Sequence, residues 1–256
     1  MTPPSLPVAW AAPAGVGAWM STRAGGVSVA PFDSLNVGTA VGDDALAVAE
    51  NRRRVAEALG AAPVWLRQVH GARVVRVHAE DAGRDPHEAD AAWTDAPGVA
   101  CTVQVADCLP VLLATRCGRG VAAAHAGWRG LAGGVVEAAL GALCEGTSVA
   151  PADVVAWLGP CIGPGQFEVG ADVVEAFGES LREPDPRRFI ARARGDGSLR
   201  WLANLPRLAR ERLVRAGVRQ VDGGAWCTVE DASRFFSFRR DGRTGRLVAA
   251  VWRDAG

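Results

Sequence analysis

Four short, almost entirely apolar runs lie in the middle of this 256-residue chain, and they constrain its fold more than any other feature. The runs cover residues 99–105, 111–115, 121–125 and 154–158. Runs this short and this apolar are typical of β-strands that are covered on both faces of a sheet. Helices are expected around them, at residues 45–59, 127–143, 171–177 and 202–216. The chain is therefore predicted to be a mixed α/β protein with a sheet core and helices outside.

The remaining segments complete this outline. Further strands are predicted at residues 64–69, 74–78 and 218–221, with a final hairpin formed by residues 235–238 and 247–252. Asp43 or Asp44 is a suitable N-cap for the first helix, and Gly60 is a suitable stop. Residues 181–200 are highly charged and are interpreted as an inserted loop. For a chain of this length, one domain spanning residues 1–256 is the simplest expectation.

Composition narrows the possible partners and compartment. The formal net charge is zero, so nothing global favours nucleic acid or an anionic membrane. The sequence contains no stretch of about 18 uncharged apolar residues, so no transmembrane helix is predicted. The six cysteines occur in a long chain without a secretory pattern, which favours reduced thiols in the cytoplasm. All 28 basic residues are arginine, and guanidinium groups suit phosphate or carboxylate ligands.

Three potential metal ligands fall at the ends of predicted strands. They are His70 in a Gln-Val-His-Gly segment, Cys108 in Ala-Asp-Cys-Leu-Pro, and His125 in His-Ala-Gly-Trp-Arg-Gly. Two imidazoles and one thiolate are ligands that zinc prefers. Three protein ligands leave a fourth position open, which is typical of a catalytic rather than a structural zinc site.

The spacing of these residues leaves other interpretations open. It is not the local pattern of a zinc finger, and a histidine after a strand is often only a structural residue. Cys108 and a histidine could instead form a nucleophilic dyad. His78 and His87 lie in polar surroundings, and either could supply a fourth ligand. Asp107 could be a hydrogen-bond acceptor behind the metal ligands, a general base, or a turn residue that caps backbone amides.

Several residues in glycine-rich or turn segments are candidates for substrate binding. Guanidinium groups near helix-end amides are suited to phosphate, although a solvated surface role is the common alternative for any one arginine. Asn36 could read a purine edge or a ribose, or could simply bond to the backbone of its loop. The arginine candidates are Arg23, Arg129, Arg239 and Arg240.

Taken together, these segments resemble one family closely. It is the laccase-domain family, whose members are described as polyphenol oxidases, purine nucleoside phosphorylases or peptidoglycan editing factors. The resemblance runs in order over nearly the whole chain. The matching segments are Ser21–Ser28, Ser34–Gly38, Glu50–Arg52, Gln68–Gly71, Ala89–Ala91, Ala106–Pro110, His125–Gly130, Leu158–Pro164, Phe167–Gly170, Phe236–Gly242 and Thr244–Arg246.

The resemblance implies a four-layer α/β/β/α sandwich with mixed sheets, and a zinc ion held by His70, Cys108 and His125. It implies phosphorolysis of adenosine, inosine, guanosine or 5′-methylthioadenosine to the free base and a sugar 1-phosphate, with adenosine deamination as a second activity. Open zinc lowers the pKa of water to near 7, and Asp107 is a candidate proton shuttle. Phosphate, the co-substrate, would be positioned by Arg23 and by Arg239 or Arg240.

Three rival functions remain at this stage. One is a peptidoglycan precursor amidase that removes misincorporated L-Ser, since metal-assisted amide hydrolysis needs the same open site. A second is a copper polyphenol oxidase, which is disfavoured because these ligands serve one ion only. A third is a non-enzymatic binding protein with a structural zinc, which needs a fourth ligand. A monomer and a homodimer are equally open. The chain also has Phe167 and Phe238 where the family often has tyrosine, and Gly165 and Gln166 where further cysteines are common.

Overall fold

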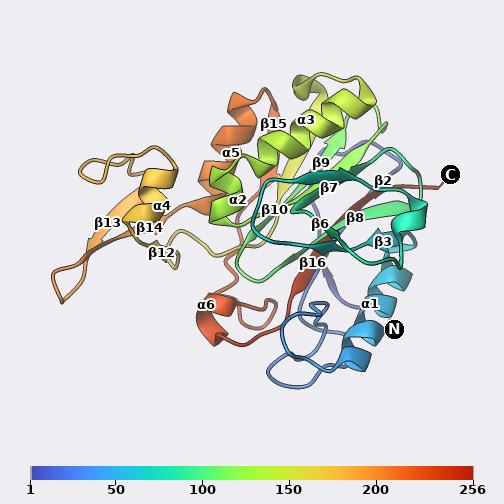
Figure 1. Ribbon diagram of the computed structural model, residues 1–256, viewed down its shortest axis with the longest axis horizontal. Helices are drawn as coiled ribbons and strands as arrows, with labels where there is room; N and C mark the ends of the chain where they lie inside the picture. Colours follow the sequence, from blue (N-terminus) through green and yellow to red (C-terminus); the bar gives the residue numbers. More distant parts are fainter. Residues whose placement is uncertain (1, 256) are drawn as a thin grey trace.

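Two β-sheets form the centre of the molecule, as a computed structural model describes it for residues 2–255 (Figure 1). The first sheet has five strands. In spatial order they are β1 (Ser5–Leu6), β2 (Val16–Ser21), β16 (Leu247–Arg253), β8 (Val99–Val105) and β3 (Ala62–Val64). Only the edge strand β3 runs parallel to its neighbour, and the other pairs are antiparallel. The last strand of the chain therefore lies at the middle of this sheet.

The second sheet has six strands and contains most of the apolar runs. In spatial order they are β15 (Gln220–Gly223), β11 (Val154–Leu158), β9 (Leu109–Thr115), β10 (Val121–Ala126), β7 (Ala91–Thr94) and β5 (Val74–Arg76). Its two outermost pairs are parallel and its inner pairs are antiparallel. Every residue of β9, β10 and β11 is buried, which agrees with strands covered on both faces.

The core is divided among three clusters of buried side chains. One cluster joins the two sheets and includes Met20, Val103, Leu112 and Trp157. A second lies between the six-stranded sheet and helices that include α3 (Val135–Thr147) and α5 (Leu205–Arg215). The third lies beneath α1 (Ala45–Leu59), against the five-stranded sheet. The predicted mixed α/β class is confirmed, and the finer four-layer ordering stays a prediction.

The helices begin and end largely where local chemistry predicts. Asp44 caps α1 by accepting a hydrogen bond from the Ala47 amide, and Gly60 ends it in a left-handed conformation. The predicted helix at 127–143 is in fact two helices, because the Gly133–Gly134 pair separates them and Gly134 has a φ of 93°. The other helical segments are α2 (Trp128–Ala132), α4 (Ala171–Ala176), α6 (Phe238–Asp241), η1 (Ala79–Asp81) and η2 (Pro151–Asp153).

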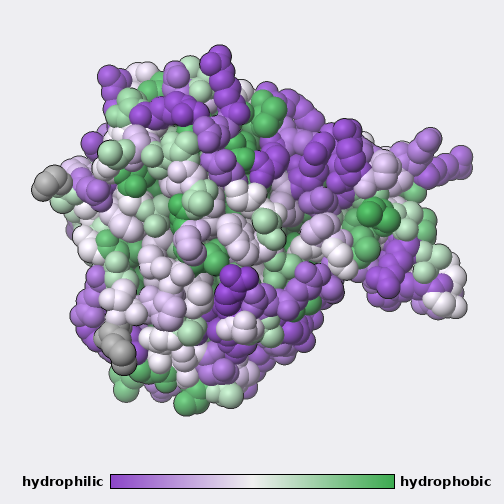
Figure 2. Space-filling model, turned by 180° about the vertical axis from the view of Figure 1, so that it is seen from behind, coloured by the Kyte–Doolittle hydropathy of each residue, from purple (hydrophilic) through white to green (hydrophobic). Residues whose placement is uncertain are grey.

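A small sheet projects from the body of the molecule and corrects the predicted loop at residues 181–200 (Figure 1). Its strands are β12 (Glu168–Val169), β14 (Leu199–Ala203) and β13 (Phe189–Ala193), in that order. Four of the five residues of β13 are exposed, so the buried, apolar pattern that marks the central strands is missing here. Hydrophobic groups on this arm lie among hydrophilic ones on the molecular surface (Figure 2), and Ile190 and Leu199 are exposed.

Two more local predictions need correction. Residues 235–238 are not a strand, because Phe235 and Phe236 fill the core between the sheets and Ser237 then caps α6. The strand predicted at 64–69 is divided between β3 and the short β4 (Leu66–Arg67), which pairs with β6 (His87–Glu88). The six cysteines are free. No helix within residues 2–255 combines the length and apolar character needed to span a membrane.

Two glycines in α3 offer a matched test of how this helix packs on β7. An added Cβ at Gly146 would lie 2.0 Å from the ring of Trp93, whereas one at Gly141 would meet nothing within 4 Å. We expect Gly146→Ala to lower the free energy of unfolding by about 1–3 kcal/mol through overpacking. Gly141→Ala should raise it by about 0.5–1 kcal/mol, because alanine favours a helix. Urea unfolding measures both, and equal effects at the two positions would contradict this packing.

Candidate metal centre

The three predicted metal ligands come together where the two sheets approach each other. The turn at residues 106–108 links β8 of the first sheet to β9 of the second, and it places Cys108 just before β9. His125 lies in β10, where it pairs with Pro110 of β9. His70 follows β4 in a loop. Because β9 and β10 are neighbours, the strand register brings Cys108 and His125 to the same end of the sheet.

The geometry of this triad fits one metal ion. One ligand atom from each of His70, Cys108 and His125 lies within 4.8 Å of the others. The Cys108 Sγ is 3.7 Å from the His70 Nε2, and the two imidazole rings meet edge to face with centroids 4.8 Å apart. Tetrahedral zinc with ordinary Zn–N and Zn–S bonds places such atoms about 3.3–3.7 Å apart. The donor set therefore suits zinc in type, and the Cys108–His70 pair also suits it in spacing.

Burial is graded across the triad. His125 is buried, Cys108 is half-buried and His70 is exposed. The ligand set consequently faces solvent on one side and the core on the other. Within residues 2–255 no fourth histidine, cysteine or carboxylate belongs to the group. His87, one of the two other histidines, instead lies 3.0 Å from Asp81 on the surface.

The Asp90 carboxylate connects His70 and His125 through hydrogen bonds. Asp90 was not among the site residues predicted from the sequence. Its Oδ1 lies 2.8 Å from the His125 Nδ1, and the carboxylate also accepts hydrogen bonds from the amides of Val69, His70 and Gly71. Asp90 is fully buried. A proton on Nδ1 leaves the Nε2 of His125 free as a ligand atom. The one signal that could have found Asp90 is the Ala-Asp-Ala segment shared with the resembled family.

Asp90 also stabilises an unusual backbone. His70 has a φ of 62°, in the left-handed region that non-glycine residues seldom adopt. Its amide and the two neighbouring amides are all bonded to the one carboxylate. Burial raises the pKa of Asp90, but hydrogen bonds from His125 and Gly71 outweigh burial and hold the pKa below its usual value. The carboxylate therefore fixes the loop that carries one ligand and the ring of another.

Electrostatics favour a thiolate at the centre. Burial raises the pKa of Cys108, but the adjacent His125 and His70 outweigh this effect and lower the pKa to about 6. For His125, burial has the opposite effect and lowers the pKa, but the neighbouring Cys108 and Asp90 outweigh it and raise the pKa to about 9. The thiolate is the form of cysteine that binds metal.

Two glycines beside the triad lie so close to other residues that a larger side chain would not fit there. A Cβ at Gly127 would lie 2.8 Å from the His70 ring and 3.0 Å from the Cys108 Sγ. One at Gly130 would lie 2.8 Å from the carbonyl oxygen of Gly71. The glycines of the Gly-Trp-Arg-Gly segment therefore give the ligands room to converge, with Gly127 as the N-cap of α2 and Gly130 inside that helix.

Asp107 lies next to Cys108 but is held by other parts of the chain. Its Oδ1 accepts a 2.6 Å hydrogen bond from the Thr228 hydroxyl, and its Oδ2 accepts a 2.6 Å bond from the Arg239 amide. Its φ of 87° is again left-handed. Asp107 thus joins the metal-site turn to α6 and to the loop before it. Both of its carboxylate oxygens already have partners in this structure.

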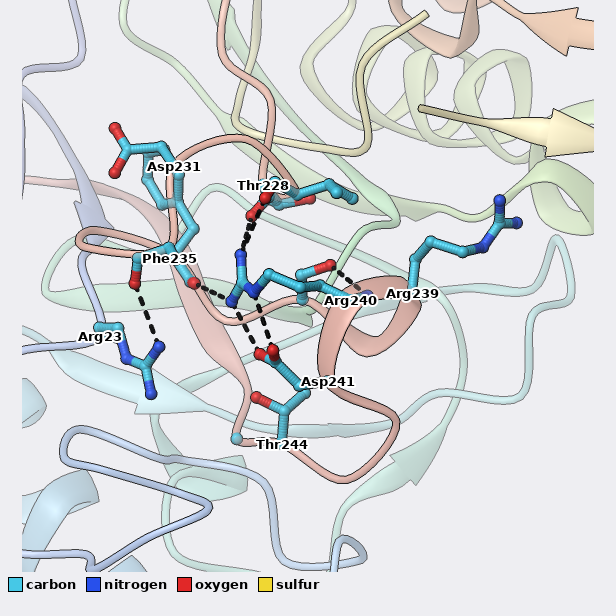
Figure 3. Close-up of polar contacts among 12 residues, drawn as sticks. Arg23, Thr228, Asp231, Phe235, Arg239, Arg240, Asp241 and Thr244 are labelled. Atoms are coloured by element: carbon cyan, nitrogen blue, oxygen red, sulfur yellow. Dashed lines mark hydrogen bonds and ion pairs between the residues drawn. The ribbon is translucent and has the colours of Figure 1, made fainter. Parts of the chain in front are cut away.

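The structure places the predicted substrate residues in different settings (Figure 3). The Arg240 guanidinium donates to the carbonyls of Thr228, Val229 and Phe235 and pairs with Asp241, so it holds the loop around α6. Arg239 is exposed and donates to the Gln166 and Glu168 carbonyls.

The other candidates come from other segments of the chain. Arg23 donates to the Asp33 and Ala232 carbonyls, which gives it a similar structural role to that of Arg240. Arg129 is exposed and stacks on Trp128, 4.3 Å from the ring centroid. Asn36 is fully buried, and its amide bonds to Gly38, Asp43 and Arg246. Asn36 therefore supports its loop in this structure, and its role as a substrate contact stays a prediction.

These features define a mixed α/β protein with an open metal-binding group of one thiolate and two imidazoles. A family model described as multi-copper polyphenol oxidoreductase laccase matches residues 17–254, and the chain belongs to this family. Purine nucleoside phosphorylase PA4543 of Pseudomonas aeruginosa is 50% identical over 95% of this chain and 96% of the relative. Purine nucleoside phosphorylase YfiH of Escherichia coli K12 is 46% identical over the same shares.

Solved structures show the same fold. The crystal structure of the Neisseria meningitidis protein NMB0706 matches with a TM-score of 0.88 and 45% identity, over 98% of this chain and 99% of that chain. The structure of YlmD from Geobacillus stearothermophilus matches with a TM-score of 0.84 and 35% identity, over 94% and 93%. The resemblance inferred from the sequence motifs is confirmed by these comparisons.

The role assigned to Asp90 can be tested by metal affinity. An asparagine there has one acceptor oxygen, so it cannot receive both the His125 Nδ1 proton and the three backbone amides. We expect Asp90→Asn to weaken zinc binding about 10- to 100-fold, measured by competition with a chromophoric chelator. Asp95→Asn is the matched control, because Asp95 pairs with Arg76 away from the triad. Wild-type affinity in Asp90→Asn would contradict the role.

Proposed function

We propose that this chain is a zinc-dependent purine nucleoside phosphorylase, with residues 1–256 acting as one catalytic domain. Its substrates would be adenosine, inosine, guanosine or 5′-methylthioadenosine, and phosphate would yield the free base and a sugar 1-phosphate. The observation that carries the proposal is the three-ligand metal group, open to solvent through His70. The names of relatives that are 50% and 46% identical over nearly the full chain support the reaction class.

Zinc is the metal that the residues fit best. Two imidazoles and one thiolate form a typical catalytic zinc set, and they leave room for one further ligand. Copper oxidases that reduce oxygen to water need several copper ions, and the family description refers to that chemistry. The described part of this chain gathers three such side chains at one place, which is enough for a single ion. The ligand count therefore favours zinc chemistry over phenol oxidation.

The chain's own groups divide the work of the reaction. His70, Cys108 and His125 would hold the ion, while Asp90 keeps the His125 ring in the required tautomer. When bound, zinc supplies a Lewis acid that polarises a substrate oxygen or phosphate and lowers the pKa of water to near 7. Arg129 and Arg239 are exposed beside the ligand segments, and we propose that their guanidinium groups attract and orient phosphate. Arg23 and Arg240 would support this surface indirectly, through the backbone carbonyls they bind.

Adenosine deamination is proposed as a second activity of the same centre, because attack of water on the amino-bearing carbon also needs an open Lewis acid. The two catalytic outcomes differ in one requirement. Phosphorolysis consumes inorganic phosphate, whereas deamination releases ammonia without it. The editing amidase is the rival that shares the metal, and it would act on a peptidoglycan precursor instead of a nucleoside.

A histidine pair gives a matched test of this proposal. We expect His125→Ala to lose bound zinc and to lower phosphorolysis of inosine at least about 100-fold, because a two-ligand site binds metal weakly. His87→Ala removes an exposed histidine that pairs with Asp81, and it should keep both zinc and activity. Zinc is measured by elemental analysis, and hypoxanthine release is measured with and without phosphate.

The outcomes separate the candidate functions. Base release that depends on phosphate in wild type and is lost in His125→Ala supports the phosphorylase. Full turnover by a zinc-free His125→Ala protein would refute a metal-dependent reaction. Activity on a muropeptide precursor with none on nucleosides would instead assign the amidase.

A further inference from the structure

One exposed aromatic side chain lies on a segment that is hydrogen-bonded to the turn carrying Cys108. Phe238 is 58% exposed, and it is the only aromatic residue among the large hydrophobic side chains that are exposed in residues 2–255. It begins α6, and the amide of the next residue, Arg239, donates to the Asp107 carboxylate at 2.6 Å. Asp107 immediately precedes the ligand Cys108, so this hydrogen bond ties the start of α6 to the metal-site turn.

The backbone that carries the Phe238 ring is held in place by hydrogen bonds and by buried neighbours. Ser237 is fully buried and caps α6 by accepting from the Arg240 amide, while the Arg240 guanidinium bonds to three carbonyls of the preceding loop. Phe235 and Phe236, just before the cap, are fully buried in the core. The same short segment therefore anchors two phenylalanines inside and holds the third in solvent, which is an unfavourable place for an aromatic side chain that has no partner.

A second exposed apolar side chain adjoins the triad from another segment. Val69 is 49% exposed, immediately before His70, and its amide is fixed by Asp90. Exposed apolar side chains thus stand on the His70 loop and on α6, the two segments that Asp90 and Asp107 tie to the ligands. The Arg239 guanidinium, on the residue after Phe238, lies over the Phe167 ring and adds positive charge to this surface. An apolar wall beside a cationic group suits a flat heteroaromatic ring that is linked to a sugar and is brought together with phosphate.

We propose that Phe238 is the stacking wall for the nucleobase, with Val69 adding apolar contact, so that the site selects two-ring bases over one-ring bases. This inference rests on the proposed nucleoside reaction and identifies how that site recognises its substrate. Stacking of a base on an aromatic side chain gains from the contact area and from the offset geometry of two π-systems. A purine covers more of the phenyl ring than a pyrimidine does, and a peptide amide offers no comparable face.

The first test is steady-state kinetics with inosine and uridine. Phe238→Ala should raise KM for inosine roughly 5- to 100-fold, the range that loss of one base–aromatic stack implies, and kcat should change less than about threefold. The ratio of kcat/KM for inosine over uridine should fall by a similar factor. Phe238→Trp should retain wild-type KM, and Phe238→Leu should lie between. Leu46→Ala, which removes another exposed apolar side chain on α1, is the control and should change neither parameter.

A binding measurement keeps the inference separate from the proposed reaction. Calorimetric titration of the zinc-loaded protein with adenine needs no turnover, and Phe238→Ala should weaken adenine binding by the same 5- to 100-fold. Zinc content and the unfolding midpoint should match wild type in every variant. If Phe238→Ala weakens adenine binding while the wild-type protein shows no phosphorolysis, the stacking proposal is supported and the proposed phosphorylase reaction is refuted. Adenine affinity and inosine KM within twofold of wild type in Phe238→Ala, with zinc retained, would overturn the stacking proposal.

Discussion

The buried carboxylate of Asp90 is the interaction on which the metal centre depends. The Asp90 carboxylate is hydrogen-bonded to the ring of His125 and also accepts hydrogen bonds from three consecutive loop amides, including that of His70. A fully buried carboxylate is tolerable only when its oxygens are satisfied, and here every partner belongs to the ligand framework. The same bonds that offset the burial of the charge therefore place two of the three metal ligands. This coupling explains how a loop residue with a left-handed backbone can hold a defined position beside a strand.

The two sheets provide the rest of the constraint. Cys108 lies on the turn that crosses from the five-stranded to the six-stranded sheet, and Asp107 in that turn binds Thr228 and the amide of Arg239. Segments far apart in sequence thus meet at one edge, with the core clusters fixing their relative positions. Glycine at position 127 gives the ligands the space that a side chain would fill. The result is a rigid, partly open site, which is the arrangement that catalysis by a preorganised centre requires.

The central strands were predicted from their local apolar pattern, and the three ligands from their residue types together with the family motifs that contain them. The apolar runs at 99–105 and 121–125 are typical of buried strands, with Cys108 in the turn after the first run and His125 at the end of the second. Asp90 was missed because its role arises from a contact with His125, 35 residues away. The projecting strand β13 was missed because its exposed, arginine-containing residues resemble a loop. Asn36 and Arg240 were predicted as substrate groups from their turn segments, and the bonds that they make to distant backbone atoms could not be read from those segments.

The central claim is that one zinc ion is held by one sulfur and two imidazole nitrogens, with a remaining position free of protein ligands. X-ray absorption at the zinc edge on the zinc-loaded wild-type protein measures this most directly. The account predicts one zinc per chain, one Zn–S distance of about 2.3 Å, two Zn–N distances of about 2.0–2.1 Å, and a light fourth scatterer that exchanges with added phosphate. A site with no zinc–sulfur contact, or with four protein ligands that phosphate does not displace, would contradict it.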